Sequence, residues 1–167
     1  MEKIFRVNLS DLSVKIEDVP QVWAGLGGRG LTSSIIAREV PPTCHPLGES
    51  NKLVFAPGFL SGTGAACSGR LSAGAKSPLT GGIKESNVGG TAAQMMARMG
   101  IKALIIEGQP EKETFYGLHV TKDSVTIAEE TEMMARGNFT VINTLVEKSG
   151  KKIGVLSIGQ AGEMKMA

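Results

Sequence analysis

The chain opens with two runs of alternating apolar and polar residues. Residues 4–9 (IFRVNL) and 13–18 (SVKIED) both alternate, and Ser10, Asp11 and Leu12 lie between them. A period of two is typical of strands with one buried face, and polar residues between two such runs indicate a turn. The pattern therefore predicts an N-terminal β-hairpin with one face in the core.

The segment after the predicted hairpin has apolar residues at the spacing of a helix. In the segment QVWAGLGGRGLTSSIIAREV, the apolar residues Leu31, Ile35 and Ile36 recur at the spacing of one helix face, which predicts a helix of about ten residues. Pro41 and Pro42 are expected to end this helix, since proline cannot continue it. The next segment, PPTCHPLGESN, has the composition of a loop.

Short apolar runs predict three further strands. Residues 52–56 (KLVFA) read as a buried strand, residues 70–77 (RLSAGAKS) as a second strand that turns at its end, and residues 101–108 (IKALIIEG) as a third. The segment SNVGG, residues 86–90, comes directly before the Ala- and Met-rich segment TAAQMMARMG. We therefore predict that residues 86–90 lie at a helix N-terminus.

The last third of the chain predicts a hairpin over 114–128, a helix from Asn138 as N-cap to Gly150, and a strand over 152–159. Two antiparallel hairpins interrupt the alternation of helix and strand, which favours an α+β fold over a doubly wound parallel sheet. Three times a short apolar strand runs into a glycine-bearing turn: PGFLSG, EGQP and GQAGE. This suggests two related β-sheet and helix units that arose by internal duplication.

Composition and charge narrow the class of protein. The 167 residues fit one domain, 1–167, and 41% hydrophobic with 20% charged residues indicates a globular protein. A net charge of +2 with dispersed Lys and Arg argues against nucleic-acid binding, and the absence of a long apolar run argues against a membrane span. The expected compartment is the cytoplasm. Cys44 and Cys67 lack CxxC spacing, so we predict two buried, reduced structural thiols.

A glycine-rich stretch from Pro57 to Gly90 holds nine of the 22 glycines. Because glycine has no Cβ, a ligand can approach its main-chain N–H groups closely, so the stretch predicts a surface for a large polar ligand. The known phosphate loops do not fit: GAKS lacks the P-loop spacing, and GLGGRG follows no convincing strand. No GxSxG nucleophile motif occurs. The isolated His45 and His119 are expected to be structural or exposed.

The order of several motifs resembles a known family. KLVFAPGFLSGT, SGR, KSPLTG, SNVGG, a helix and IKALIIEG follow one another as in the N-terminal, cofactor-binding domain of the tungsten-containing aldehyde ferredoxin oxidoreductases. IFRVNLS, GLGGRGL and SIGQAGE match the same pattern, so the resemblance covers essentially the whole chain. It implies two related β-sheet units that form the base for a tungsten (or molybdenum) bis-pyranopterin cofactor.

The resemblance also implies the contacts. It gives cofactor contacts to Arg70, Asn87 and Gly89. The chemistry of the residues agrees: a guanidinium fork suits pterin and phosphate acceptors, and the amide oxygen of Asn87 suits a Mg²⁺ ion that bridges phosphates. Gly89 and Gly90, expected at a helix N-terminus, can present free N–H groups to an anion, so Gly90 is added to the cofactor-binding residues. Without the resemblance, Arg70 could pair with a surface carboxylate and Asn87 could cap a helix. Lys76 is interpreted as a strand-end charge.

For the full-length protein, the resemblance implies an enzyme that converts an aldehyde to a carboxylic acid and passes electrons to ferredoxin. A four-iron four-sulfur (4Fe-4S) cluster would be bound by C-terminal domains outside this chain. We expect the chain to be a non-catalytic fragment, either truncated or separately encoded, whose exposed apolar surface favours a homo-oligomer. Two alternatives stay open: a stand-alone module that binds an anion or nucleotide without redox activity, and an assembly domain whose glycines serve only strand packing.

Overall fold

The computed structural model describes residues 2–112 and 114–166. Its elements are, in chain order, β1 (Lys3–Asn8), β2 (Ser13–Asp18), the 3₁₀ helix η1 (Gln21–Trp23), α1 (Gly28–Glu39), β3 (Lys52–Pro57), β4 (Arg70–Lys76), β5 (Ile83–Gly89), α2 (Thr91–Arg98), β6 (Ile101–Glu107), β7 (Tyr116–Val120), β8 (Val125–Glu129), the 3₁₀ helix η2 (Thr131–Met133), α3 (Asn138–Ser149) and α4 (Gln160–Glu163). None of the described helices is long and apolar enough to cross a bilayer.

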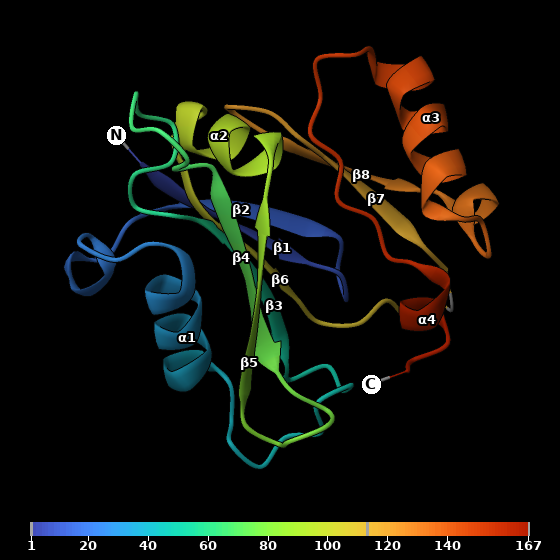
Figure 1. Cartoon of the computed structure of the whole chain (residues 1–167). Coiled ribbons are helices and arrows are strands. Elements are labelled where there is room, and N and C mark those ends of the chain that lie inside the picture. The colour runs from blue at the N-terminus through green and yellow to red at the C-terminus, as the bar shows by residue number, and fades with distance from the viewer. Residues whose placement is uncertain (1, 113, 167) are drawn as a thin grey trace.

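A six-stranded sheet forms the centre of the molecule (Figure 1), with the strand order β2-β1-β6-β3-β4-β5. β1 and β6 pair in parallel, and the other neighbours in this sheet are antiparallel. β7 and β8 form a separate antiparallel hairpin. The chain thus has a mixed arrangement of sheet and helices in which antiparallel pairs predominate.

Apolar side chains are buried on both faces of the large sheet. On one face, Leu31 and Ile35 of α1 pack with Val54 and Ile105 of the sheet. On the other face, Leu71 packs in a second cluster with residues of α2, and the β7–β8 hairpin adds partly buried apolar side chains. Removal of these side chains from water is the main force that holds the three layers together.

Most predicted elements are present. The N-terminal hairpin, α1, β3, β4, β6, the second hairpin and α3 all lie within a few residues of their predicted bounds. Gly150 is the C-cap residue of α3, as predicted, but the N-cap residue is Gly137 and not Asn138. Local periodicity was therefore a sufficient guide wherever a strand or helix buries one face.

The helix predicted directly after residues 86–90 is present as α2, and Gly90 is its N-cap residue. The sequence did not predict β5, of which residues 86–89 form the end. The strand predicted over residues 152–159 is wrong. Residues 153–159 form no strand in the described part of the chain. They run instead past α2, where Gly154 lies against Ala92.

The internal duplication stays a prediction. A hairpin, a 3₁₀ helix and a twelve-residue helix follow one another twice, as β1-β2-η1-α1 and as β7-β8-η2-α3. The first set belongs to the six-stranded sheet, whereas the second has a sheet of two strands within residues 114–166. The two halves share an order of elements but not a common sheet.

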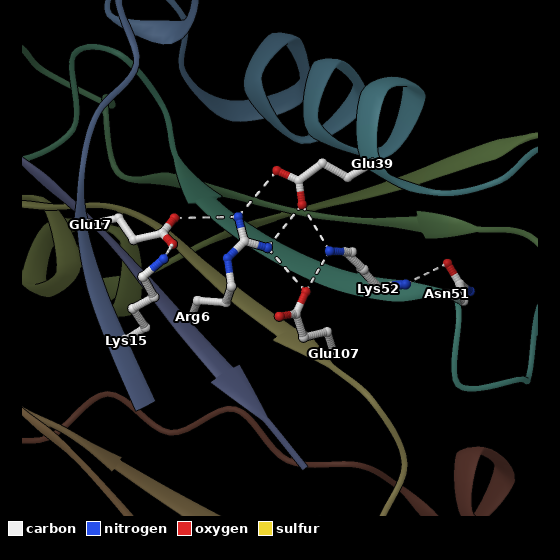
Figure 2. A network of polar contacts seen from close by, with 7 residues as sticks. All are labelled: Arg6, Lys15, Glu17, Glu39, Asn51, Lys52 and Glu107. Atoms are coloured by element: carbon white, nitrogen blue, oxygen red, sulfur yellow. Dashed lines mark hydrogen bonds and ion pairs between the residues drawn. The ribbon is translucent and has the colours of Figure 1, made fainter. Parts of the chain in front are cut away.

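Charged side chains join the C-terminal end of α1 to the sheet (Figure 2). Glu39, the last residue of α1, accepts hydrogen bonds from Arg6 Nη1 and from Lys52 Nζ, each at 2.9 Å. Glu107 of β6 accepts from the same two cations, at 3.0 Å from Arg6 Nη1. Glu17 of β2 lies 3.5 Å from Arg6 Nη2. We call Arg6, Glu17, Glu39, Lys52 and Glu107 the charge network.

The charge network is mostly buried, and contacts within it shift the pKa values of Arg6 and Glu39 toward the charged forms. Burial alone would raise the pKa of Glu39, but hydrogen bonds and positive charges from Arg6 and Lys52 hold this pKa below its usual value. Burial alone would lower the pKa of Arg6, but Glu39 and Glu107 raise it above its usual value. The network therefore ties α1 to four strands of the sheet, β1, β2, β3 and β6, and stabilises the charged forms of Arg6 and Glu39.

The close contact between α1 and β4 depends on Gly74. A Cβ atom at this position would lie 2.6 Å from Thr32 Cβ of α1, closer than side chains normally approach. We expect Gly74→Ala to lower the free energy of unfolding by about 2 kcal/mol, because the helix must shift away from the sheet. Denaturant unfolding of the purified protein measures this. Gly82→Ala is the matched control, since its Cβ would meet only Thr80 Oγ1, at 3.7 Å; equal losses for both variants would contradict the prediction.

Candidate functional site

The four predicted site residues lie at one end of β4 and β5. Arg70 begins β4, Asn87 and Gly89 lie in the last part of β5, and Gly90 is the N-cap residue of α2. In the antiparallel register, Arg70 is opposite Gly89, and Ser72 is opposite Asn87. Strand pairing therefore brings the SGR and NVGG motifs together on one surface.

Arg70 and Asn87 contact each other directly. Nε of Arg70 donates to Oδ1 of Asn87 at 2.6 Å, and Nδ2 of Asn87 donates to Oγ of Ser72 at 3.1 Å. Both Arg70 and Asn87 are exposed. The Arg70 Nη groups make no side-chain hydrogen bond within residues 2–112 and 114–166. The guanidinium is thus held at one nitrogen, and its fork is free to bind an acceptor.

The two glycines keep the surface beside Arg70 open. A Cβ on Gly89 would lie 3.2 Å from Nη1 of Arg70, so a side chain there would crowd the guanidinium. Gly90 has φ +121°, a conformation that other residues rarely adopt. No side chain caps α2, which leaves its first N–H groups available to a ligand.

The N-terminus of α1 borders the same surface. The GLGGRG segment, which follows no convincing strand, places Gly28 beside β4: a Cβ on Gly28 would lie 3.4 Å from Oγ of Ser72. The N-cap residue of α1, Gly27, provides no side-chain hydrogen bond. The uncapped N-termini of α1 and α2 therefore both lie next to the Arg70 and Asn87 pair, and each carries a partial positive charge that favours an anion.

Glu85 is a site residue that sequence reasoning missed. It lies two residues before Asn87, on the same face of β5, and Nε of Arg29 donates to its Oε2 at 3.1 Å. Its side chain is only 9% exposed, and Oε1 has no hydrogen-bond partner among the described residues. The Ser72 hydroxyl has the largest effect on its pKa and, with Arg29, outweighs burial and lowers it. Glu85 is therefore an ionised carboxylate with one unsatisfied oxygen.

Lys76 is the last residue of β4 and precedes a turn, as predicted. It is nevertheless buried, and its Nζ donates to the carbonyl groups of Cys44, at 2.7 Å, and Pro42. It thereby fixes the loop after α1. Cys67 is exposed and Cys44 half-buried, so the prediction of two buried thiols is wrong.

The candidate site is an open surface. A mostly apolar hollow does occur near Asn51, Lys52 and Gln109, but it lies at the opposite end of β4 from Arg70. None of the four predicted site residues lines this hollow.

The residues present fit a phosphate-bearing cofactor with a metal ion. The guanidinium fork of Arg70 suits phosphate, the open glycine surface admits a ring system, and the unsatisfied oxygen of Glu85 needs a donor or a cation. Nowhere in the described residues do three His, Cys, Asp or Glu side chains gather as metal ligands. A Mg²⁺ ion at Asn87 would accordingly take most of its ligands from phosphate oxygens and water, as Mg²⁺ commonly does.

A mixed sheet whose edge carries exposed arginine, open glycines and two uncapped helix N-termini defines a domain suited to a large anionic ligand. Comparison with known protein families identifies the family. Residues 4–167 match the family described as "Aldehyde ferredoxin oxidoreductase, N-terminal domain". The chain belongs to this family.

Individual relatives agree with the family match. The chain is 34% identical over 164 residues to the tungsten-containing aldehyde ferredoxin oxidoreductase of Pyrococcus furiosus, and 35% identical over 164 residues to that of Thermococcus kodakarensis. Both alignments cover 96% of this chain and 27% of the relative, so the chain spans about a quarter of their length. A solved structure, the active site complex BamBC of benzoyl coenzyme A reductase with 1,5 dienoyl-CoA, is similar with a TM-score of 0.90 at 26% identity, over 96% of this chain and 25% of that one.

Proposed function

We propose that this chain is the cofactor-binding part of an oxidoreductase that converts an aldehyde to a carboxylic acid and passes electrons to ferredoxin. The observation that carries the proposal is the Arg70 and Asn87 pair, which lies beside Gly89 and two uncapped helix N-termini. A tungsten or molybdenum bis-pyranopterin supplies the redox chemistry when bound. The chain itself contributes binding and orientation.

Each predicted contact has a chemical task in this proposal. The free Nη groups of Arg70 bind phosphate or pterin oxygens, and the N–H groups at Gly89 and Gly90 bind an anion. Oδ1 of Asn87 already accepts from Arg70, but an amide oxygen has two lone pairs and can also bind Mg²⁺. One asparagine would thus hold the metal ion and the arginine in a fixed relation.

The proposal assigns the remaining tasks to other parts of the enzyme. Arg70, Asn87, Gly89 and Gly90 are all exposed, so other domains would have to cover the cofactor and exclude water from it. The 4Fe-4S ligands, the aldehyde pocket and the ferredoxin surface would lie in those domains. Cytoplasmic location and a homo-oligomeric state belong to the same proposal.

Metal and pterin analysis tests the proposal. The full-length protein, purified from cells supplied with tungstate and molybdate, is expected to contain near-stoichiometric tungsten or molybdenum by mass spectrometry, together with pterin that fluoresces after oxidation. Absence of both metal and pterin would contradict cofactor binding. Ferredoxin reduction with a panel of aldehydes tests the reaction separately: a protein that holds the cofactor but oxidises no aldehyde would retain the binding role and lose the assigned reaction.

A further inference from the structure

We propose that Arg29, held in position by Glu85, is a second anion-binding residue of the candidate site and contacts a phosphate group of the cofactor together with Arg70. This inference rests on the proposed function and extends it to two residues that the sequence did not assign to the site: Arg29, which lies within the GLGGRGL segment, and Glu85.

Arg29 and Arg70 are held in the same way. Each donates through Nε to a side chain of β5: Arg29 to Glu85 at 3.1 Å, and Arg70 to Asn87 at 2.6 Å. The Nη groups of Arg29, like those of Arg70, make no side-chain hydrogen bond among the described residues, and the Arg29 side chain is 75% exposed. Both forks are therefore oriented by a fixed acceptor and remain free to bind an anion.

The two acceptors lie on one face of β5. Glu85 and Asn87 are two residues apart in the strand, which separates their Cα atoms by about 7 Å. Ser72, opposite Asn87 in the register, accepts a hydrogen bond from Asn87 Nδ2. Strand alternation places Glu85, Asn87, Ser72 and Arg70 on one face of β4 and β5, and Arg29 of α1 bonds to Glu85 on that face.

Stability alone is a poor explanation for the Arg29 and Glu85 pair. An ion pair with an exposed arginine contributes little to stability, since water and salt weaken it. Glu85, in contrast, is 9% exposed and has an unsatisfied oxygen, and burial of such an oxygen is unfavourable. A carboxylate that is buried at a cost and orients an exposed guanidinium is typical of a binding site.

The position of Arg29 in the chain supports an anion as the ligand. It is the second residue of α1, and the first turn of this twelve-residue helix has no side-chain cap. A phosphate at this point would meet free N–H groups, the positive end of the helix dipole and the guanidinium fork together. The first turn lies next to Ser72, so that phosphate would lie on the surface that carries Arg70.

Pyrophosphate titration tests this inference without the loaded enzyme. The full-length protein is purified from cells deprived of tungstate and molybdate, and pyrophosphate affinity is measured by calorimetry at low salt, with and without Mg²⁺. We expect Arg29→Gln to weaken binding about tenfold, because one charge-assisted fork is lost. Lys84→Gln is the matched control: Lys84 is exposed on the opposite face of the same strand, and its loss should change affinity less than about twofold.

Glu85→Ala separates positioning from simple charge. Removal of a negative charge beside an anion site strengthens binding if Glu85 acts only through its charge, whereas loss of the acceptor that orients Arg29 weakens it. We expect weaker binding for Glu85→Ala and nearly normal binding for Glu85→Gln, whose amide oxygen still accepts from Nε. Tighter binding by Glu85→Ala, or unchanged binding by Arg29→Gln, would overturn the inference.

The two proposals can fail separately. A protein that carries tungsten or molybdenum with pterin, yet binds pyrophosphate equally well with and without the Arg29 side chain, would keep the proposed function and lose this inference. A wild-type protein that does not bind pyrophosphate at all would also contradict the inference. Because Arg29 is exposed, its replacement should leave the unfolding midpoint unchanged, so a failure to fold would not obscure the result.

Discussion

Replacement of Asn87 with alanine is expected to lower the tungsten or molybdenum content of the full-length protein by at least about tenfold. Asn87 contacts both Arg70 and Ser72. Its loss would leave the guanidinium without the acceptor that orients it, and would remove the amide oxygen that we propose as a Mg²⁺ ligand. Metal analysis and pterin fluorescence, measured on protein purified from cells supplied with both oxyanions, give the result.

Ser86→Ala is the control for this experiment. Ser86 lies next to Asn87 in β5, is exposed and points to the other face of the sheet, so its variant should retain the full metal content. Since Asn87 is itself exposed, neither substitution should alter the unfolding midpoint much. An Asn87→Ala protein with normal metal and pterin content would contradict the role proposed for this residue and favour a purely structural use of the glycine-rich surface.

Replacement of Arg6 with methionine is expected to lower the free energy of unfolding by about 3 kcal/mol at neutral pH. Arg6 bonds Glu39 and Glu107, and all three side chains are largely buried. Removal of the cation would leave these carboxylates to share Lys52, and an uncompensated buried charge is strongly unfavourable. Lys15→Met is the matched control, because Lys15 also pairs with Glu17 of the network but is 74% exposed; its loss should cost under about 0.5 kcal/mol.

The pH dependence of unfolding, measured for wild type and Arg6→Met, tests whether the lost stability comes from the charge of Arg6. The folded-state pKa of Glu39 is lowered, so its contribution to stability is present above the unfolded pKa of about 4.3 and is lost as the pH falls through the folded value. The difference in unfolding free energy between wild type and Arg6→Met should therefore shrink below about pH 4. A difference that stays constant from pH 7 to pH 3 would show that Arg6 acts through packing and not through charge.

The sequence predicted those elements that bury one regular face, and missed those that do not. Residues 4–9 and 52–56 alternate or form apolar runs because their side chains meet the core, and both are strands. β5, in contrast, lies at the edge of the sheet with most of its side chains exposed. Its polar string has no period to recognise, and the glycines at its end resemble the start of a helix.

The residues of the candidate site likewise fall into those that the sequence predicted and those that only the structure shows. The positions of Arg70, Asn87, Gly89 and Gly90 came from an ordered set of motifs. Strand pairing places the first three on one surface, and Gly90 follows directly at the N-cap of α2. Arg29 and Glu85 are 56 residues apart in sequence, and neither stands in a recognisable spacing to the other. Their contact depends on how α1 lies across β4 and β5, and local sequence patterns carry no information on that arrangement.

The placement of α1 also has a consequence for the energetics of ligand binding. One end of this helix is fastened by the charge network at Glu39, its middle rests directly on Gly74, and its other end carries Arg29. A twelve-residue helix spans about 18 Å and is stiff over that length. The backbone beneath the proposed anion-binding groups is thus preorganised, and a ligand would have to immobilise only the outer ends of two arginine side chains, which keeps the entropic cost of association small.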